Sequence, residues 1–138
     1  MTQWIFFDVG NVLLNDDPVM AAVFRHIWLS IREKGHEIGF EELLHQREEI
    51  SRRGPQKRIH HEVALQYLTP LEWKQTRRRY LDETLPVLSR YCPPIPGIPE
   101  TVRRWKSRRN LGLIANQPKE VIPLLERLGL WEPFQVRG

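Results

Sequence analysis

Two patterns of hydrophobic and polar positions alternate along this chain. Residues 3–8 contain a short, unbroken apolar run, WIFF at residues 4–7, and predict a strand covered on both faces in a parallel sheet. Residues 111–116 form a second such run, and residues 134–136 could begin a third strand. Elsewhere, helical spacing and turn signals predict helices at residues 18–34, 41–52, 58–68, 70–83, 100–108 and 118–128. Strands that alternate with helices in this order indicate an α/β fold with a parallel sheet.

The helical block after the first strand is too long for a simple crossover between neighbouring strands. We therefore interpret residues 15–91 as an inserted helical cap, and residues 1–14 with 92–138 as a partial α/β core. A proline-rich segment at residues 91–100 reads as a rigid linker between them. Within the cap, Thr69 and Glu72 have the spacing of a capping box at the start of a helix.

Composition narrows the class of protein. With 138 residues, 41% of them hydrophobic, the chain can form one core with a small insertion, but no apolar run approaches the length of a membrane span. The net charge of +4 and the arginine clusters suggest nucleic acid, yet acids are interspersed, so we expect solvated helix faces instead. Cys92 is the only cysteine, which excludes an internal disulfide and suits the cytoplasm. No secretory signal is expected at the N-terminus.

Asp8 is the candidate for chemistry because it ends a strand that is otherwise apolar. In open α/β sheets, ligands bind beyond the carboxyl ends of the strands, where Ala115 and Asn116 also lie if the two strands are neighbours. Backbone amides of the Gly10–Asn11 turn, and of a helix beginning near Pro118, would favour an anion such as phosphate. Asp8 would then act as a nucleophile or hold magnesium. Spacing alone leaves a plain turn residue equally open.

Three stretches of the sequence carry a family resemblance. "FFDVGNVLLNDD" resembles the first motif of the haloacid dehalogenase-like hydrolase superfamily, in which an apolar strand delivers an aspartate nucleophile. "LGLIANQP" is similar to the second motif, and "IPGIPETVRRWKSRR" is similar to the segment that leads into it. The resemblance covers nearly the whole chain. It implies a Rossmann-like core with a small helical cap, and the substrate class would be small phosphorylated metabolites.

The resemblance implies a magnesium-dependent phosphatase. Asp8 would attack phosphorus and form an aspartyl-phosphate, while Mg²⁺ would bind Asp8 and the backbone carbonyl of Gly10. Gly10, Asn11, Ala115 and Asn116 would surround the phosphate. A second acid would protonate the leaving group and later activate water.

The sequence departs from the family pattern at two of these positions. The second aspartate of the first motif falls on Gly10, and the hydroxyl residue of the second motif falls on Ala115. Asp16 and Asp17 are close in sequence, but we expect them to lie past the turn and not to replace the missing acid. The loss at Ala115 removes a hydroxyl contact to phosphate, although the Asn116 amide could remain.

The third and fourth motifs, a lysine and a pair of acids, do not occur before Gly138. Without them the charge of the phosphate is not balanced and the magnesium shell is incomplete, so we expect this chain to be impaired or inactive. The first strand should also be an exposed apolar edge, which favours self-association. The alternative function is a non-catalytic binding or regulatory module that uses the cap or this edge.

Overall fold

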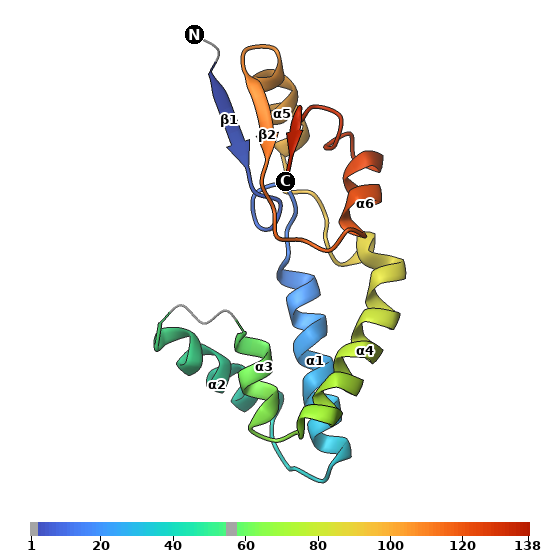
Figure 1. Cartoon of the computed structure of the whole chain (residues 1–138). Helices are drawn as coiled ribbons and strands as arrows, with labels where there is room; N and C mark the ends of the chain where they lie inside the picture. The colour runs from blue at the N-terminus through green and yellow to red at the C-terminus, as the bar shows by residue number, and fades with distance from the viewer. Residues whose placement is uncertain (1–2, 55–57) are drawn as a thin grey trace. The chain divides into compact units, whose positions relative to one another are not determined.

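The computed structural model describes residues 3–54 and 58–138 of the chain (Figure 1). These residues form two compact units: residues 3–19 with 85–138, and residues 20–54 with 58–84. The elements in chain order are β1 (Trp4–Phe7), α1 (Asp17–Glu33), α2 (Phe40–Arg52), α3 (Ile59–Leu65), α4 (Pro70–Thr84), η1 (Leu85–Arg90), α5 (Ile98–Lys106), β2 (Asn110–Leu113), α6 (Val121–Arg127) and β3 (Val136–Arg137). The predicted α/β class is therefore confirmed. The 3-10 helix η1 was not predicted.

The sheet is three-stranded and parallel, in the order β1-β2-β3 (Figure 1). Its register pairs Phe6 with Gly112 and Gly112 with Val136, so these residues share one face. A side chain at Gly112 would begin 2.3 Å from the Phe6 ring, which is why glycine suits the middle of β2. As predicted, β1 is an edge strand of the sheet that the structure describes.

One face of this sheet is open among the described residues. Trp4 and Phe6 are 41% and 51% exposed, and Ile114 and Val136 are exposed as well. Ile5 and Phe7 point to the other face and pack against the core. The prediction that the first strand is covered on both faces is therefore wrong. An unbroken apolar run does not tell which of its two alternating sets of side chains meets a covering layer.

The core of the α/β unit lies under the covered face of the sheet. Phe134 and Leu111 are essentially inaccessible to solvent, and the Phe134 ring meets the edge of Phe7 at a centroid distance of 5.7 Å. Helix α6 contributes Leu124 and Leu125 to this core. The helix ends because Gly129 adopts a φ of +67°, a conformation that glycine reaches without strain.

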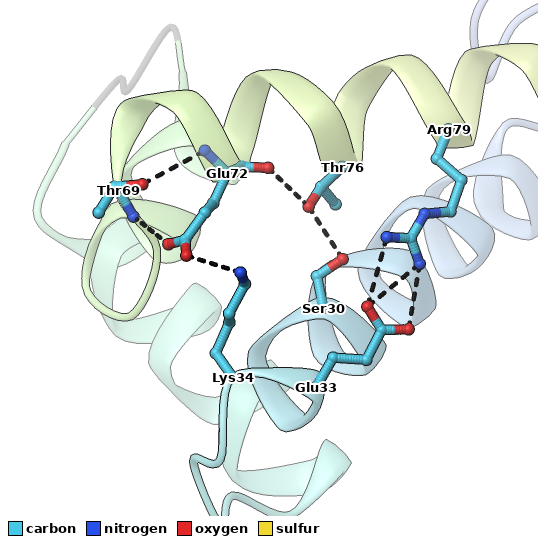
Figure 2. A network of polar contacts seen from close by, with 7 residues as sticks. All are labelled: Ser30, Glu33, Lys34, Thr69, Glu72, Thr76 and Arg79. Carbon is cyan, nitrogen blue, oxygen red and sulfur yellow. Dashed lines mark hydrogen bonds and ion pairs between the residues drawn. The ribbon is translucent and has the colours of Figure 1, made fainter.

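The helical unit has its own apolar core and a polar network (Figure 2). Val23, Ile27 and Ile31 of α1 are buried at the helical spacing that the sequence predicted. Figure 2 shows Arg79 of α4 paired with Glu33 of α1 at 3.1 Å. The buried Thr76 hydroxyl lies 2.9 Å from the hydroxyl of Ser30, also on α1, so both polar groups are satisfied.

The predicted capping box at the start of α4 is confirmed. The Thr69 backbone N–H donates to Glu72 Oε2 at 2.9 Å, and the Glu72 N–H donates to Thr69 Oγ1 at 3.3 Å (Figure 2). Lys34 adds an ion pair to Glu72 at 2.9 Å. Hydrogen bonds from Lys34 and then from Thr69 lower the pKa of Glu72 to about 2.

This lowered pKa predicts a loss of stability in acid. The ionised form of Glu72 is favoured by folding, so its contribution is present above its ordinary pKa of 4.5 and is lost as the pH falls towards about 2. We expect urea unfolding to show Glu72→Gln less stable than the wild type at pH 6 and equally stable near pH 2. The control Glu42→Gln removes an exposed carboxylate of α2 that forms no ion pair with the described residues. A pH-independent difference at Glu72 would contradict the prediction.

Within the described ranges, the structure has no helix that is both long enough and apolar enough to cross a membrane.

Candidate active site

Asp8 follows β1 at the carboxyl end of the parallel sheet. Phe7 is in register with Leu113, and the Ile114 N–H donates to the Phe7 carbonyl at 2.9 Å. The residue after β1 and the loop after β2 therefore leave the sheet at the same edge. Asp8 is exposed, and its Oδ1 accepts a hydrogen bond of 2.7 Å from the Val9 N–H. One carboxylate oxygen is thus held by the backbone while the group stays open to solvent.

The chain turns back sharply after Asp8. The Val9 carbonyl accepts hydrogen bonds from the N–H groups of Leu13 and Leu14 at 2.9 and 3.0 Å. Asn11 has a φ of +54°, a left-handed conformation that asparagine adopts more readily than most residues. Leu14 consequently returns to form a bridge with Gly10. This turn brings the residues that follow it close to the end of β1.

Asp16 lies inside this arrangement, so the expectation that it lies past the turn is wrong. A side chain added at Gly10 would begin 2.3 Å from Asp16 Oδ2 and 2.8 Å from Gln117 Nε2. The Asp16 N–H donates to Asn11 Oδ1 at 3.1 Å, and the Gln117 amide donates to Asp16 Oδ2 over a long 3.4 Å. The tight turn and the asparagine side chain fold the backbone of Asp16 back over Gly10. Asp17 is exposed.

Asp16 and Asp8 are close enough for their charges to interact. Burial is the main reason why the pKa of Asp16 is raised, and the charges of Asp8 and then Asp17 raise it further. The hydrogen bond from Gln117 acts in the opposite direction. A carboxylate whose pKa is raised by burial and by a neighbouring carboxylate is typical of sites that move protons or bind cations.

The loop after β2 differs from its predicted form. Strand β2 ends at Leu113, so Ala115 and Asn116 lie in the loop after the strand and are not its last residues. The Ala115 N–H donates to the Gly138 carbonyl at 3.1 Å, and Asn116 is exposed. Helix α6 begins at Val121 instead of Pro118 and has only 7 residues. The predicted helix start at Pro118 is therefore three residues too early.

A cavity of about 230 Å³ lies in the same unit and shares residues with this edge. Its walls are mainly apolar, and its polar lining includes Gln117, Lys119 and Arg137. The Arg137 guanidinium stacks over the Trp131 ring at 4.6 Å. Gln117 therefore both lines the cavity and contacts Asp16. Two cationic side chains in an apolar cavity suit a small organic anion.

This edge of the sheet offers oxygen donors of the kind that magnesium prefers. The described residues contain no group of three or more His, Cys, Asp and Glu side chains able to hold a metal. The exposed Asp8 carboxylate nevertheless offers a hard oxygen donor, and the Gly10 carbonyl follows two residues later. Mg²⁺ is commonly held by one or two carboxylates together with water and substrate phosphate. The residues present therefore fit a weakly held, substrate-assisted Mg²⁺.

Comparison with solved structures decides the fold. The chain matches, at a TM-score of 0.65 and 13% identity, a haloacid dehalogenase-like family hydrolase from Streptococcus pneumoniae, with 99% of this chain and 60% of that chain covered. The chain has a haloacid dehalogenase-like fold. A predicted phosphoglycolate phosphatase from Haemophilus somnus 129pt gives a TM-score of 0.62 at 18% identity, covering 99% of this chain and 61% of that one.

A haloacid dehalogenase superfamily hydrolase of subfamily IA from Geobacter sulfurreducens gives a TM-score of 0.58 at 17% identity, with the same coverage of 99% and 61%. The chain thus spans about three fifths of the length of these haloacid dehalogenase-like proteins. No protein-family model and no curated protein sequence matches it. At these identities the likeness establishes the fold and leaves the activity to be argued from the site.

Sequence reasoning missed Asp16 and Gln117. Gln117 belongs to the second motif-like stretch, but nothing in its spacing predicts a contact with residue 16. The signal for Asp16 was the Gly10–Asn11 pair, because asparagine tolerates the left-handed conformation of a tight turn. A tight turn returns the chain within a few residues, whereas we expected the chain to move away.

Proposed function

We propose that this chain carries a phosphoryl-transfer site in which Asp8 is the nucleophile. The observation that supports the proposal most is the pair of carboxylates, Asp8 and Asp16, at the carboxyl end of β1 in a haloacid dehalogenase-like fold. Asp8 would attack the phosphorus of a small phosphate ester and form an aspartyl-phosphate. Water would then hydrolyse that intermediate. The bond from Val9 N–H to Asp8 Oδ1 would hold the carboxylate in a fixed orientation for the attack.

Mg²⁺ would be held by Asp8 and the backbone carbonyl of Gly10, and it would offset the negative charge of the phosphate. The Gly10 N–H and the exposed Asn116 would contact the phosphate oxygens, whereas the Asn11 backbone N–H already donates to the Leu14 carbonyl at 2.7 Å. Among the described residues, no lysine or arginine forms an ion pair with Asp8. We therefore propose that the turnover of residues 1–138 alone is slow, because little fixed positive charge faces the transferring group.

The substrate we propose is a small phosphorylated metabolite. The cavity with Lys119 and Arg137 could hold a second anionic group or a polar end of such a molecule. The helical segment, residues 15–91, would act as a cap that selects the substrate. The compartment we propose is the cytoplasm, because a chain with a single cysteine can form no internal disulfide and suits a reducing environment.

Hydrolysis of p-nitrophenyl phosphate with and without metal tests the proposal. We expect slow release of nitrophenol that requires Mg²⁺, is abolished by excess EDTA and returns when Mg²⁺ is added back. Sedimentation of the same preparation should be recorded at several protein concentrations. Hydrolysis that EDTA does not change would contradict the metal dependence, and absence of hydrolysis would contradict the function.

The second candidate is a non-catalytic module that binds through its sheet. It is favoured by the exposed side chains of Trp4, Phe6, Ile114 and Val136 on one face. We take a second copy of the chain as the partner, since the edge strand β1 carries no charged residue that would prevent pairing. An inactive chain whose sedimentation reveals a dimer would support this candidate over the first.

A further inference from the structure

The carboxylate of Asp16 occupies the place in which a side chain of residue 10 would begin. An added Cβ at Gly10 would lie 2.3 Å from Asp16 Oδ2 and 3.3 Å from Asp16 Cγ. Two full side chains therefore cannot share this space unless something shifts. Gly10 is the residue two positions after the proposed nucleophile, and Asp16 comes six residues later in the chain.

We propose that Asp16 is a catalytic residue, the second carboxylate of the phosphoryl-transfer site, and that glycine at position 10 makes room for it. This inference rests on the proposed function of Asp8. Three contacts hold Asp16 in place. The tight turn around the Val9 carbonyl returns the chain, Asn11 Oδ1 accepts the Asp16 N–H at 3.1 Å, and Gln117 reaches its carboxylate at 3.4 Å.

The ordinary role for an aspartate at this place is a helix cap. Asp16 directly precedes α1, where a side chain commonly accepts an N–H of the first turn. None of the hydrogen bonds recorded for the described residues joins the Asp16 carboxylate to that turn, and the Asp17 N–H is bound instead by Asn15 Oδ1 at 3.0 Å. The Asp16 carboxylate instead lies against Gly10 and accepts a hydrogen bond from Gln117.

The proposed steps balance. In the first, Asp8 forms a bond to phosphorus, the bond from phosphorus to the ester oxygen breaks, and that oxygen takes the proton of the Asp16 carboxyl group. In the second, water forms a bond to phosphorus, its proton passes to Asp16, and the bond from Asp8 to phosphorus breaks. An alcohol and inorganic phosphate leave, and both aspartates return to their initial states.

Burst kinetics with p-nitrophenyl phosphate test this role. Nitrophenol leaves without help from an acid, so Asp16→Asn should still release about one equivalent in a burst. Its steady-state rate should fall by about 100-fold or more, because nothing accepts the proton of the attacking water. Asparagine keeps the shape of the side chain and an oxygen for Gln117. The neighbouring control Asp17→Asn should keep both phases.

The second experiment moves the carboxylate from residue 16 to residue 10. Gly10→Asp alone should be inactive and should lower the Tm by about 5 °C or more, because its side chain collides with Asp16. The double variant Gly10→Asp with Asp16→Gly removes this collision and leaves only the 2.8 Å approach to Gln117 Nε2, the end of a flexible side chain that can move. It should therefore regain most of the lost Tm and turn over faster than Asp16→Asn.

Each outcome decides the inference. A burst with slow turnover in Asp16→Asn, together with recovery in the double variant, supports it. Unchanged turnover, or an equal loss of burst and turnover in a folded Asp16→Asn protein, overturns it while leaving Asp8 in its role. A wild-type chain with neither burst nor turnover overturns the proposed function and this inference with it.

Discussion

Asp8→Asn is expected to abolish the covalent phosphoenzyme and to lower hydrolysis of p-nitrophenyl phosphate by at least about a thousand-fold. An amide is a far weaker nucleophile than a carboxylate, so the first step of the proposed reaction has no attacking group. The fold should be retained, since Asn Oδ1 can accept the same Val9 N–H that Asp8 Oδ1 now accepts at 2.7 Å. A loss of rate would therefore report on chemistry and not on unfolding.

The measurement is the amount of acid-stable label transferred from a radiolabelled phosphate ester, together with the steady-state rate. Asp17→Asn is the matched control, because Asp17 is an exposed aspartate of the same loop whose backbone N–H, not its carboxylate, makes the recorded hydrogen bond. The control should keep the wild-type rate within about two-fold. If Asp8→Asn were as active as its control, Asp8 would not be the nucleophile.

Phe134→Ala is expected to destabilise the α/β unit by about 3–5 kcal/mol. Its side chain is fully buried against the covered face of the sheet and meets the Phe7 ring at 5.7 Å. Without the Phe134 ring, the α/β unit loses the free energy gained by transferring that ring out of water. The substitution also leaves a cavity that the short strands cannot close. A small unit has a total stability of only about 5–15 kcal/mol, so much of the α/β unit should be unfolded at 37 °C.

Urea unfolding, followed by the NMR signals of the backbone amides of the α/β unit, measures this loss of stability. The control Phe6→Ala removes the same kind of ring from the opposite, open face of the sheet, where Phe6 is 51% exposed. It should cost no more than about 1.5 kcal/mol, because only part of that side chain leaves water on folding. Equal effects of the two substitutions would contradict the assignment of the core to one face.

Local patterns were sufficient to predict most elements of this chain. The apolar runs predicted β1 and β2, and the spacing of Val23, Ile27 and Ile31 predicted helix α1. Thr69 and Glu72 predicted the capping box of α4 because both of its hydrogen bonds join residues three apart. Such features depend on contacts within one turn of the chain. They need no knowledge of what packs against it.

Element ends and faces were predicted less well. Helix α6 begins three residues later than Pro118 suggested. The 3-10 helix η1 was not predicted because its six residues carry no helical periodicity. The exposure of Trp4 and Phe6 could not be read from a run in which every residue is apolar. Which face of a strand is covered depends on helices and strands that are distant in sequence.

The sequence by itself determined the α/β class, the placement of Asp8 at the end of a strand, and the tight turn that begins with Gly10 and Asn11. Each follows from the local conformational preferences of the residues involved. Only the tertiary structure decided that Asp16 lies against Gly10 and that Gln117, about a hundred positions away, reaches it at 3.4 Å. The tight turn brings Asp16 back to Gly10, and the parallel pairing of β1 with β2 brings Gln117 to the same edge of the sheet. Their contact depends on the packed sheet, since no local preference joins residues so far apart in sequence.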